Sequence, residues 1–213
     1  MTRDTKTAIS LPTVRRLPMY YSILQEAASG KQENISSSQI AGRLQLESIQ
    51  VRKDLASIGI TGLPRIGFSV ARLMDAIEDF LGWNNTSDAV VIGAGHLGSA
   101  LAGYKGFAEK GLDIFAFFDS DKTKIGQKIQ GKEVLDIERL PELTRRMHIN
   151  IAILTVPDHA AQNAADVAIK AGIKAIWNFT LTKIIVPSGT IVERVDLAAS
   201  LAALSSKLRQ QIA

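Results

Sequence analysis

One short stretch of the sequence has the glycine spacing of a phosphate-binding turn, G-x-G-x-x-G. Its members are Gly93, Ala94, Gly95, His96, Leu97 and Gly98. The first glycine of such a turn permits the tight bend, the second leaves room for a pyrophosphate, and the third lets a helix pack against a strand. Free N–H groups at the helix start then bind phosphate. An apolar run at 89–92 precedes the glycines, so the context is strand, turn and helix, and the stretch predicts a dinucleotide site.

Residues beyond the glycine turn extend the predicted site. Asp119, followed by Ser120, ends the next apolar run along the chain. A carboxylate there accepts hydrogen bonds from the adenosine ribose hydroxyls and repels the 2′-phosphate of NADP, which favours NAD(H). Thr155, Val156 and Pro157 end a later apolar run, and such strand ends border the crevice that holds the cofactor. The alternative is that the glycines only form a tight turn, Asp119 caps a turn and Pro157 opens a helix.

The N-terminal part of the sequence has the spacing of a helix-turn-helix between residues 36 and 58. The second helix of that motif lies in the major groove of DNA, where its polar side chains reach bases or phosphates. The candidate DNA-contacting residues are Ser36, Ser37, Ser48, Gln50, Arg52, Lys53 and Arg65. Up to Arg65 the chain has nine Lys or Arg against five Asp or Glu, a modest basic bias. Taken alone, this segment fits a small helical domain with a charged, solvated face better than a DNA-binding domain.

Composition excludes several other classes of protein. The sequence has no cysteine, which rules out disulfides, zinc thiolate sites and thiol nucleophiles, and we predict no metal site. A response to redox state must therefore act through a bound cofactor. No apolar run reaches the roughly 18 residues of a membrane span. The polar start of the chain is unlike a signal peptide, so we expect a cytoplasmic protein.

A dehydrogenase needs an acid or base beside the substrate carbon, and the histidines are the first candidates. His96 lies in the glycine turn and His148 precedes an apolar run, which leaves His159 as the candidate base. A dinucleotide-binding unit also takes up nearly all of the chain after residue 88, which leaves little for a substrate domain. We therefore predict no catalytic residues. Two alternatives stay open: a small NAD-dependent dehydrogenase, and an NAD-binding regulatory or assembly subunit that does not bind DNA.

The periodicity of apolar residues divides the chain near residue 88. Before that point it predicts helices at 17–28, 48–57 and 70–81, a short helix after a Ser36–Gln39 capping box, and a glycine-punctuated wing at 58–68. In the helix at 48–57 we expect Ile49 and Leu55 to face the core.

Beyond residue 88 the pattern changes to strands that alternate with helices, which implies a parallel, doubly wound sheet. The predicted strands are at 89–92, 114–118, 133–135, 151–156 and 175–179, with helices after Gly98 and at 140–147 and 158–171. A terminal amphipathic helix at 195–212 has a stripe of four leucines, Leu197, Leu201, Leu204 and Leu208. The sheet does not need this helix, so its apolar face requires another partner, for which a second subunit is a good candidate.

The combined motifs resemble those of the Rex-type redox-sensing repressors of bacteria. In the N-terminal half, the resemblance is carried by Arg16-Leu17-Pro18-Met19-Tyr20-Tyr21, Ser36-Ser37 and Gln50-Val51-Arg52-Lys53-Asp54. Further on it is carried by Gly93-Ala94-Gly95-His96-Leu97-Gly98, Tyr104-Lys105-Gly106-Phe107, Phe118-Asp119, Ile153-Leu154-Thr155-Val156-Pro157, Asn178-Phe179 and Val195-Asp196-Leu197-Ala198. The resemblance runs from about residue 9 to residue 204.

This resemblance implies a homodimer that binds double-stranded operator DNA, an inverted repeat, and whose cofactors are NADH and NAD+. It further implies that the C-terminal helix swaps between subunits and that NADH closes the dimer and releases DNA. Tyr104 and Asp196 match a tyrosine and an aspartate of the switch across the dimer, and Arg16 matches an arginine that can pair with that aspartate. Asn178 and Phe179 match residues at the cofactor, with Phe179 beside the nicotinamide. The ordinary alternative for Asp196 is to cap the terminal helix.

The sequence departs from the Rex pattern in the wing, where Leu63 stands in place of a basic residue. Contact of the wing with the minor groove is therefore an open point. His96 stands where the family often has Asn. The fold class that we predict is a mainly helical winged helix-turn-helix at 1–82, an α/β Rossmann domain with a parallel doubly wound sheet at 83–194, and a domain-swapped dimerisation helix at 195–213.

Overall fold

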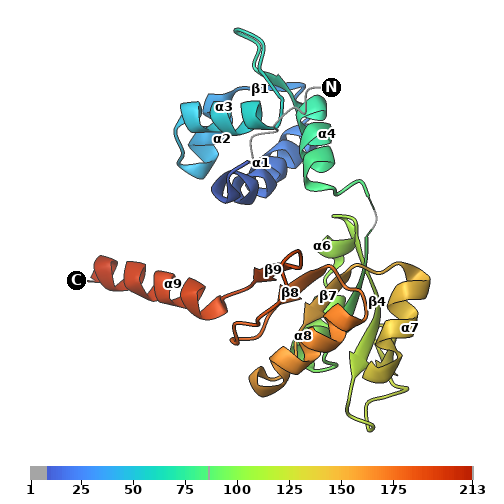
Figure 1. Ribbon diagram of the computed structural model, residues 1–213. Coiled ribbons are helices and arrows are strands. Elements are labelled where there is room, and N and C mark those ends of the chain that lie inside the picture. Colours follow the sequence, from blue (N-terminus) through green and yellow to red (C-terminus); the bar gives the residue numbers. More distant parts are fainter. Residues whose placement is uncertain (1–8, 86, 213) are drawn as a thin grey trace. The chain divides into compact units, whose positions relative to one another are not determined.

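The computed structural model describes residues 9–85 and 87–212, and the chain divides into two compact units, residues 1–85 and 86–213 (Figure 1). The first unit is mainly helical. Its helices are α1 (Leu11–Ser29), α2 (Ser37–Leu44), α3 (Ser48–Ser57) and α4 (Val70–Leu81). Its two short strands are β1 (Asn34–Ile35) and β2 (Phe68–Ser69), which pair antiparallel. This order of elements agrees with the predicted winged helix-turn-helix.

Helix α1 begins earlier than the apolar pattern predicts, because a polar cap starts it. The Ser10 hydroxyl accepts a hydrogen bond from the backbone N–H of Thr13 at 3.3 Å. Pro18 lies inside the helix, where its ring removes one backbone donor. The apolar stripe that follows is fully buried at Tyr20 and Leu24. Burial of this stripe in the core of the unit holds the helix together across the proline.

The two helices of the helix-turn-helix largely follow the prediction. Helix α2 has the expected capping box, in which the Ser36 hydroxyl accepts from Gln39 N–H at 3.1 Å and the Gln39 carbonyl oxygen accepts from Ser36 N–H at 2.8 Å. Helix α3 has the predicted bounds, but the prediction that Ile49 faces the core was wrong, because its side chain is 54% exposed. Val51 and Leu55 are four residues apart on the buried side, and Ile49 lies on the far side of the helix.

The wing, residues 60–67, joins α3 to β2 and extends beyond the helices of this unit (Figure 1). Leu63 and Gly67 exchange backbone hydrogen bonds of 2.7 and 2.9 Å, which closes the hairpin. Gly67 has a φ of +92°, and a Cβ there would lie 2.5 Å from the carbonyl oxygen of Ile35. Only glycine fits at this position, so Gly67 fixes the base of the wing against β1.

The second unit is built on one mixed sheet. Its strands are β3 (Ser87–Ile92), β4 (Leu112–Asp119), β5 (Lys128–Ile129), β6 (Lys132–Asp136), β7 (Ile151–Leu154), β8 (Ala175–Asn178) and β9 (Ile191–Arg194). They lie in the order β5-β6-β4-β3-β7-β8-β9, and every pair is parallel except β5 with β6. The order reverses direction between β3 and β7, as in a doubly wound sheet. Strands β5 and β9 were not among the strands predicted from the sequence.

Helices cover both faces of this sheet. They are α5 (His96–Ala102), α6 (Lys105–Ala108), α7 (Leu140–Met147) and α8 (Ala161–Lys170), with 3₁₀ turns at Ile137–Arg139 and Asp158–Ala160. Helices α7 and α8 pack on one face around a cluster that includes Val90 and Ala165 (Figure 1). The other face carries Phe117 and, from the α5–α6 segment, Leu101 and Phe107.

Helix α9 (Leu197–Ile212) ends the described chain. Its four leucines are 53–64% exposed, and none of its residues is buried. The leucine stripe predicted from the sequence therefore lies uncovered in the single chain. No helix among residues 9–85 and 87–212 is long and apolar enough to cross a membrane.

Candidate functional site

The glycine turn after β3 is tightly packed at its first and third glycines and open at its second. Gly93 has a φ of +108°, and a Cβ there would lie 2.9 Å from the backbone of Thr155 and Val156. A Cβ on Gly98 would lie 2.5 Å from the carbonyl oxygen of Gly93. At Gly95, by contrast, an added Cβ meets nothing within 4 Å. Two glycines thus permit close packing of the chain, while the middle one borders open space in which a ligand group fits.

The turn lies where the sheet order reverses, and backbone hydrogen bonds tie three strand ends together there. The N–H of Gly93 donates to the carbonyl of Phe118 at 2.8 Å, and the N–H of Thr155 donates to the carbonyl of Ile92 at 2.9 Å. The Thr155 hydroxyl donates to the carbonyl of Gly93 at 2.8 Å. In a doubly wound sheet, ligands bind at this carboxyl edge.

Asp119, at the end of β4, holds the glycine turn in shape. One carboxylate oxygen accepts from the N–H of Ala94 at 2.8 Å and from the ammonium group of Lys124 at 3.0 Å, and the other accepts from the N–H of Asp121 at 2.9 Å. Burial alone would raise the pKa of Asp119, but these donors lower it below its ordinary value. Lys124 was not among the site residues predicted from the sequence. Ser120, which was, lies exposed beside Asp119.

Asn178 and Phe179 follow β8 and have different surroundings. The side chain of Asn178 is fully buried. Its amide oxygen accepts from the N–H and the hydroxyl of Thr180 at 2.9 and 2.8 Å, and its amide nitrogen donates to the carbonyl of Thr182 at 2.9 Å. Phe179 is half-buried, and its N–H donates to the carbonyl of Leu154 at 3.0 Å. Asn178 thus shapes the loop, while Phe179 offers a ring at the sheet edge.

Four aromatic rings form a row that connects Phe179 with Tyr104. The ring centroids are 5.0 Å apart between Phe179 and Trp177, 5.3 Å between Trp177 and Phe107, and 4.9 Å between Phe107 and Tyr104. Such tilted and edge-on pairs are favourable ring contacts. Tyr104 is 61% exposed, so the row runs from the sheet edge to an accessible tyrosine.

In the first unit, four of the predicted DNA-contacting residues line one cavity of about 540 Å³ between α3, the start of α2 and the wing. They are Ser36, Ser37, Arg52 and Arg65. Arg65 lies at the wing tip with a φ of +64°, a backbone conformation that is uncommon outside glycine. The cavity therefore combines two hydroxyls and two guanidinium groups, which are groups that bind phosphate.

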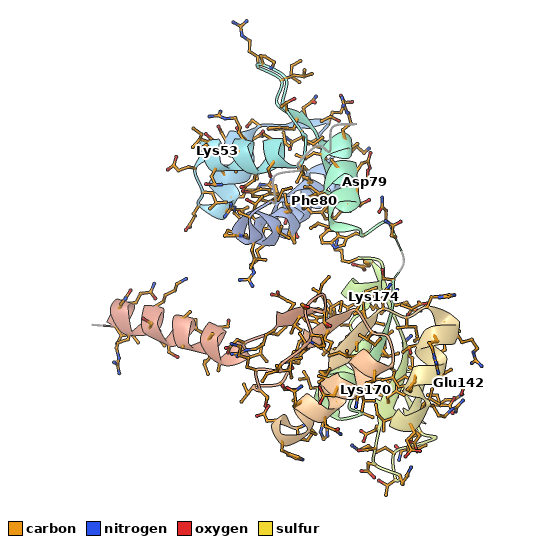
Figure 2. The ribbon with its side chains drawn as sticks, in the orientation of Figure 1. Lys53, Asp79, Phe80, Glu142, Lys170 and Lys174 are labelled. Carbon is orange, nitrogen blue, oxygen red and sulfur yellow. The ribbon has the colours of Figure 1, made fainter. Side chains whose placement is uncertain are left out.

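The other three predicted DNA-contacting residues lie outside that cavity, all on α3. Ser48 is the first residue of the helix, and Lys53 is exposed (Figure 2). Gln50 is half-buried, and its side-chain amide donates to Asp54 at 2.9 Å.

Asp54 is the centre of a buried polar cluster that joins α1 to α3. The Arg16 guanidinium donates to both of its carboxylate oxygens, at 2.6 and 2.8 Å, and the hydroxyls of Tyr20 and Thr13 donate at 2.6 and 3.0 Å. The Asp54 side chain is only 2% exposed. Burial alone would raise the pKa of Asp54, but hydrogen bonds from Arg16, Tyr20, Gln50 and Thr13 lower it to about 2. Asp54 is therefore a charged group in the core.

The three predicted switch residues each have their own partners in the single chain. Arg16 pairs with Asp54, and Tyr104 packs edge-on against Phe107. Asp196 caps α9 by accepting from the N–H of Ala199 at 2.8 Å, and it also pairs with Arg194. The ordinary capping role considered for Asp196 is thus present in this chain.

Comparison with known proteins identifies the family. The chain is 53% identical over 193 residues to the redox-sensing transcriptional repressor Rex of Treponema denticola, an alignment that covers 91% of this chain and 92% of the relative. The chain belongs to the Rex family. It is also 43% identical to the Rex repressor of Carboxydothermus hydrogenoformans, over 93% of this chain and 95% of that relative.

Solved Rex-family structures share the whole fold. The chain matches RSP, a Rex-family repressor, in complex with β-NAD+ and operator DNA, with a TM-score of 0.90, 36% identity, and coverage of 96% of this chain and 94% of that one. It matches RSP in complex with β-NADH with a TM-score of 0.87, 35% identity and 96% coverage of both chains. Two family models also match: "Putative DNA-binding protein N-terminus" at residues 8–56 and "CoA binding domain" at residues 84–182.

Membership of the Rex family settles the choice among the three readings of the sequence. The relatives are named as transcriptional repressors and not as enzymes. The dehydrogenase alternative is therefore set aside, and with it a role for His159 as a base. His159 lies exposed in the 3₁₀ turn Asp158–Ala160.

Proposed function

We propose that this Rex-family chain represses transcription as a homodimer, binds operator DNA through residues 1–82, and releases it when NADH binds to residues 83–194. The match to RSP bound to β-NAD+ and operator DNA carries the proposal, because it extends over 96% of this chain. The cavity beside α3 in the first unit and the glycine turn after β3 in the second unit supply the groups that would bind DNA and cofactor. Such a repressor acts in the cytoplasm, where bacterial DNA lies.

The DNA site is proposed on the outer surface of α3 and in the cavity beside it. Arg52 and Arg65 would bind phosphates on either side of the cavity, and Ser36 and Ser37 would bind the same backbone. Ser48, Gln50 and Lys53 lie on α3, the helix that enters the major groove in this motif. We expect the wing to contact the DNA through Arg65, since Leu63 offers no charge.

The residues of the glycine turn fit the pyrophosphate of NAD(H). The space beside Gly95 is open, and the N–H groups of His96 and Leu97 begin α5. The N–H of Ala94 is already bound by Asp119, so in our proposal Ala94 shapes the turn while later N–H groups hold phosphate.

The other strand ends complete the proposed cofactor site. Asp119 and Ser120 would bind the adenosine ribose, and Thr155, Val156 and Pro157 would form the opposite wall. Phe179 would face the nicotinamide, and Asn178 would hold the loop that follows Phe179. The cofactor supplies the redox change itself, since the chain has no cysteine.

The switch is proposed to act between subunits. The exposed leucine face of α9 requires a cover, and a swapped helix on a second subunit would provide one. Asp196 begins that helix, and in the dimer it would exchange partners between Arg16 and Tyr104. The row of four aromatic rings would connect Tyr104 with the nicotinamide ring that is proposed to bind beside Phe179. For NADH to drive release, it must bind the closed dimer better than the DNA-bound dimer.

Four affinities test the proposal: those for DNA with and without NADH, and those for NADH with and without DNA. The DNA probe is first selected from a pool of genomic fragments by retention on the protein. Coupling is reciprocal, so each ligand should weaken the other by the same factor. Tyr104→Phe should reduce that factor with less effect on DNA affinity in the absence of NADH. Independent binding of NADH and DNA in the parent would refute the redox switch, and retention of no fragment would favour a subunit that does not bind DNA.

A further inference from the structure

The Asp54 cluster places one proposed DNA-reading residue and one proposed switch residue on the same carboxylate. Gln50 Nε2 donates to Asp54 Oδ1 at 2.9 Å, and that same oxygen accepts from Arg16 at 2.8 Å. Gln50 and Asp54 lie four residues apart on α3, so their side chains share one face of the helix. Arg16 reaches the carboxylate from α1.

An ionised carboxylate can only accept hydrogen bonds, and this determines which end of the Gln50 amide faces it. The amide nitrogen must point toward Asp54, so the carbonyl oxygen points away from it. Without such a partner, a glutamine amide can turn by half a rotation and exchange its donor and acceptor ends. Asp54 therefore removes one of two orientations of Gln50.

The orientation of this amide decides which base it can read. After the bond to Asp54, Gln50 retains a carbonyl oxygen and a second N–H. Adenine presents a donor at N6 and an acceptor at N7 in the major groove, and this pair is the partner of a glutamine amide. Gln50 is the third residue of α3, and the N-terminal residues of a recognition helix are those that reach base edges.

We propose that Asp54 is a positioning residue that makes Gln50 select adenine, and that Arg16 stabilises this arrangement. The inference rests on the proposed DNA binding. The Arg16 guanidinium donates to both carboxylate oxygens of Asp54, so it holds the carboxylate in one orientation. The carboxylate then orients the amide of Gln50.

The purely structural alternative is that Asp54 only ties α1 to α3. The two readings differ in a measurable way. Loss of a structural tie weakens binding to all sequences, whereas loss of a positioning residue changes the preferred base at one position of each half-site. The test is selection of the full-length protein on a randomised DNA library without NADH, followed by sequencing.

Four proteins are compared with the parent. Gln50→Met removes the amide at nearly constant volume, and Asp54→Asn can both donate and accept, so it permits either orientation of Gln50. Thr13→Val is the matched control, because it removes another donor to the same carboxylate but leaves Gln50 its partner. The double variant Arg16→Gln with Asp54→Asn leaves no uncompensated charge, so it serves if Asp54→Asn alone does not fold.

We expect the parent and Thr13→Val to prefer adenine about tenfold at one position per half-site. Gln50→Met, and either Asp54→Asn or the double variant, should reduce that preference to less than about twofold at the same position. Uniformly weaker binding with an unchanged base preference in the folded Asp54 variants would overturn the proposal. If Gln50→Met alone changes no base, Gln50 does not read DNA and the proposal is also overturned. A parent that selects no motif would refute the proposed DNA binding itself.

Discussion

Of the three glycines of the turn, Gly95 is the one at which a substitution by valine separates cofactor binding from folding. Gly95 has φ and ψ of −98° and −173°, an extended conformation that any residue adopts. An added Cβ meets nothing within 4 Å, so the folded chain has room for the first carbon of the new side chain. The same space is where the pyrophosphate is proposed to approach, and valine would occupy it.

The expected magnitudes follow from this geometry. Gly95 is the N-cap of α5, where valine is less favourable than glycine, so the free energy of unfolding should fall by no more than about 1 kcal/mol. Loss of two charge-assisted hydrogen bonds to phosphate should weaken NADH binding by at least about 100-fold. Gly98→Ala, by contrast, should lower the stability of the fold. Its Cβ would lie 2.5 Å from the Gly93 carbonyl oxygen, and such overpacking costs about 1–3 kcal/mol of stability.

Calorimetric titration with NADH and thermal unfolding of both variants check these numbers together. Gly95→Val should unfold near the parent temperature and show no measurable heat of binding, while Gly98→Ala should unfold at a clearly lower temperature. Parental NADH affinity in Gly95→Val would refute the placement of the pyrophosphate in this turn.

Three further predictions concern other charged groups. Arg52→Ala and Lys53→Ala should each weaken DNA binding and lower the slope of the logarithm of the DNA-binding constant against the logarithm of the salt concentration by about 0.9. If titrations at several salt concentrations give the parental slope for both variants, neither residue contacts phosphate. Asp119→Ser should improve NADPH binding relative to NADH by about tenfold, because it removes a repulsive carboxylate and frees Lys124 to pair with the 2′-phosphate; an unchanged ratio in competition titrations would assign ribose recognition elsewhere. Asp54, whose pKa is lowered in the folded chain to about 2, should contribute about 2 kcal/mol of stability above pH ~4 that is lost as the pH falls toward about 2. Unfolding of the parent and Asp54→Asn across this range should show their difference shrinking at low pH, and a constant difference would contradict the argument.

Much of the fold could be predicted because local patterns and tertiary structure agree. The strands at the centre of the sheet are short apolar runs, and the capping box of Ser36 and Gln39 marks the start of α2 in the sequence itself. Strand β9 carries no such signal: it lies at the sheet edge, and of Ile191–Arg194 only Val192 is half-buried. Ile49 was misplaced because hydrophobicity alone does not tell which side of a ten-residue helix is covered.

The candidate sites were less accessible to sequence reasoning, because their contacts link distant residues. Asp54 looks like one more surface charge in Arg52-Lys53-Asp54, yet its donors Thr13, Arg16 and Tyr20 come from another helix. The bond between Asp119 and the N–H of Ala94 is equally invisible, since 25 positions separate the two residues. Residue types and spacing can indicate which chemistry is present, but the side chain that orients each group is found only in the folded chain.

The wing combines a base that tolerates only one residue with a tip that the fold constrains very little. Its base depends on one residue, Gly67, whose missing Cβ permits the contact with Ile35, whereas Leu63 and Ile66 at its tip are 63% and 55% exposed. Exchanges at exposed positions usually alter stability by less than about 0.5 kcal/mol, so selection for folding scarcely constrains the tip. If the proposed contact of the wing with DNA is made, tip residues such as Leu63 can therefore be exchanged to alter the preferred DNA sequence without loss of stability and without any change in the cofactor-binding unit.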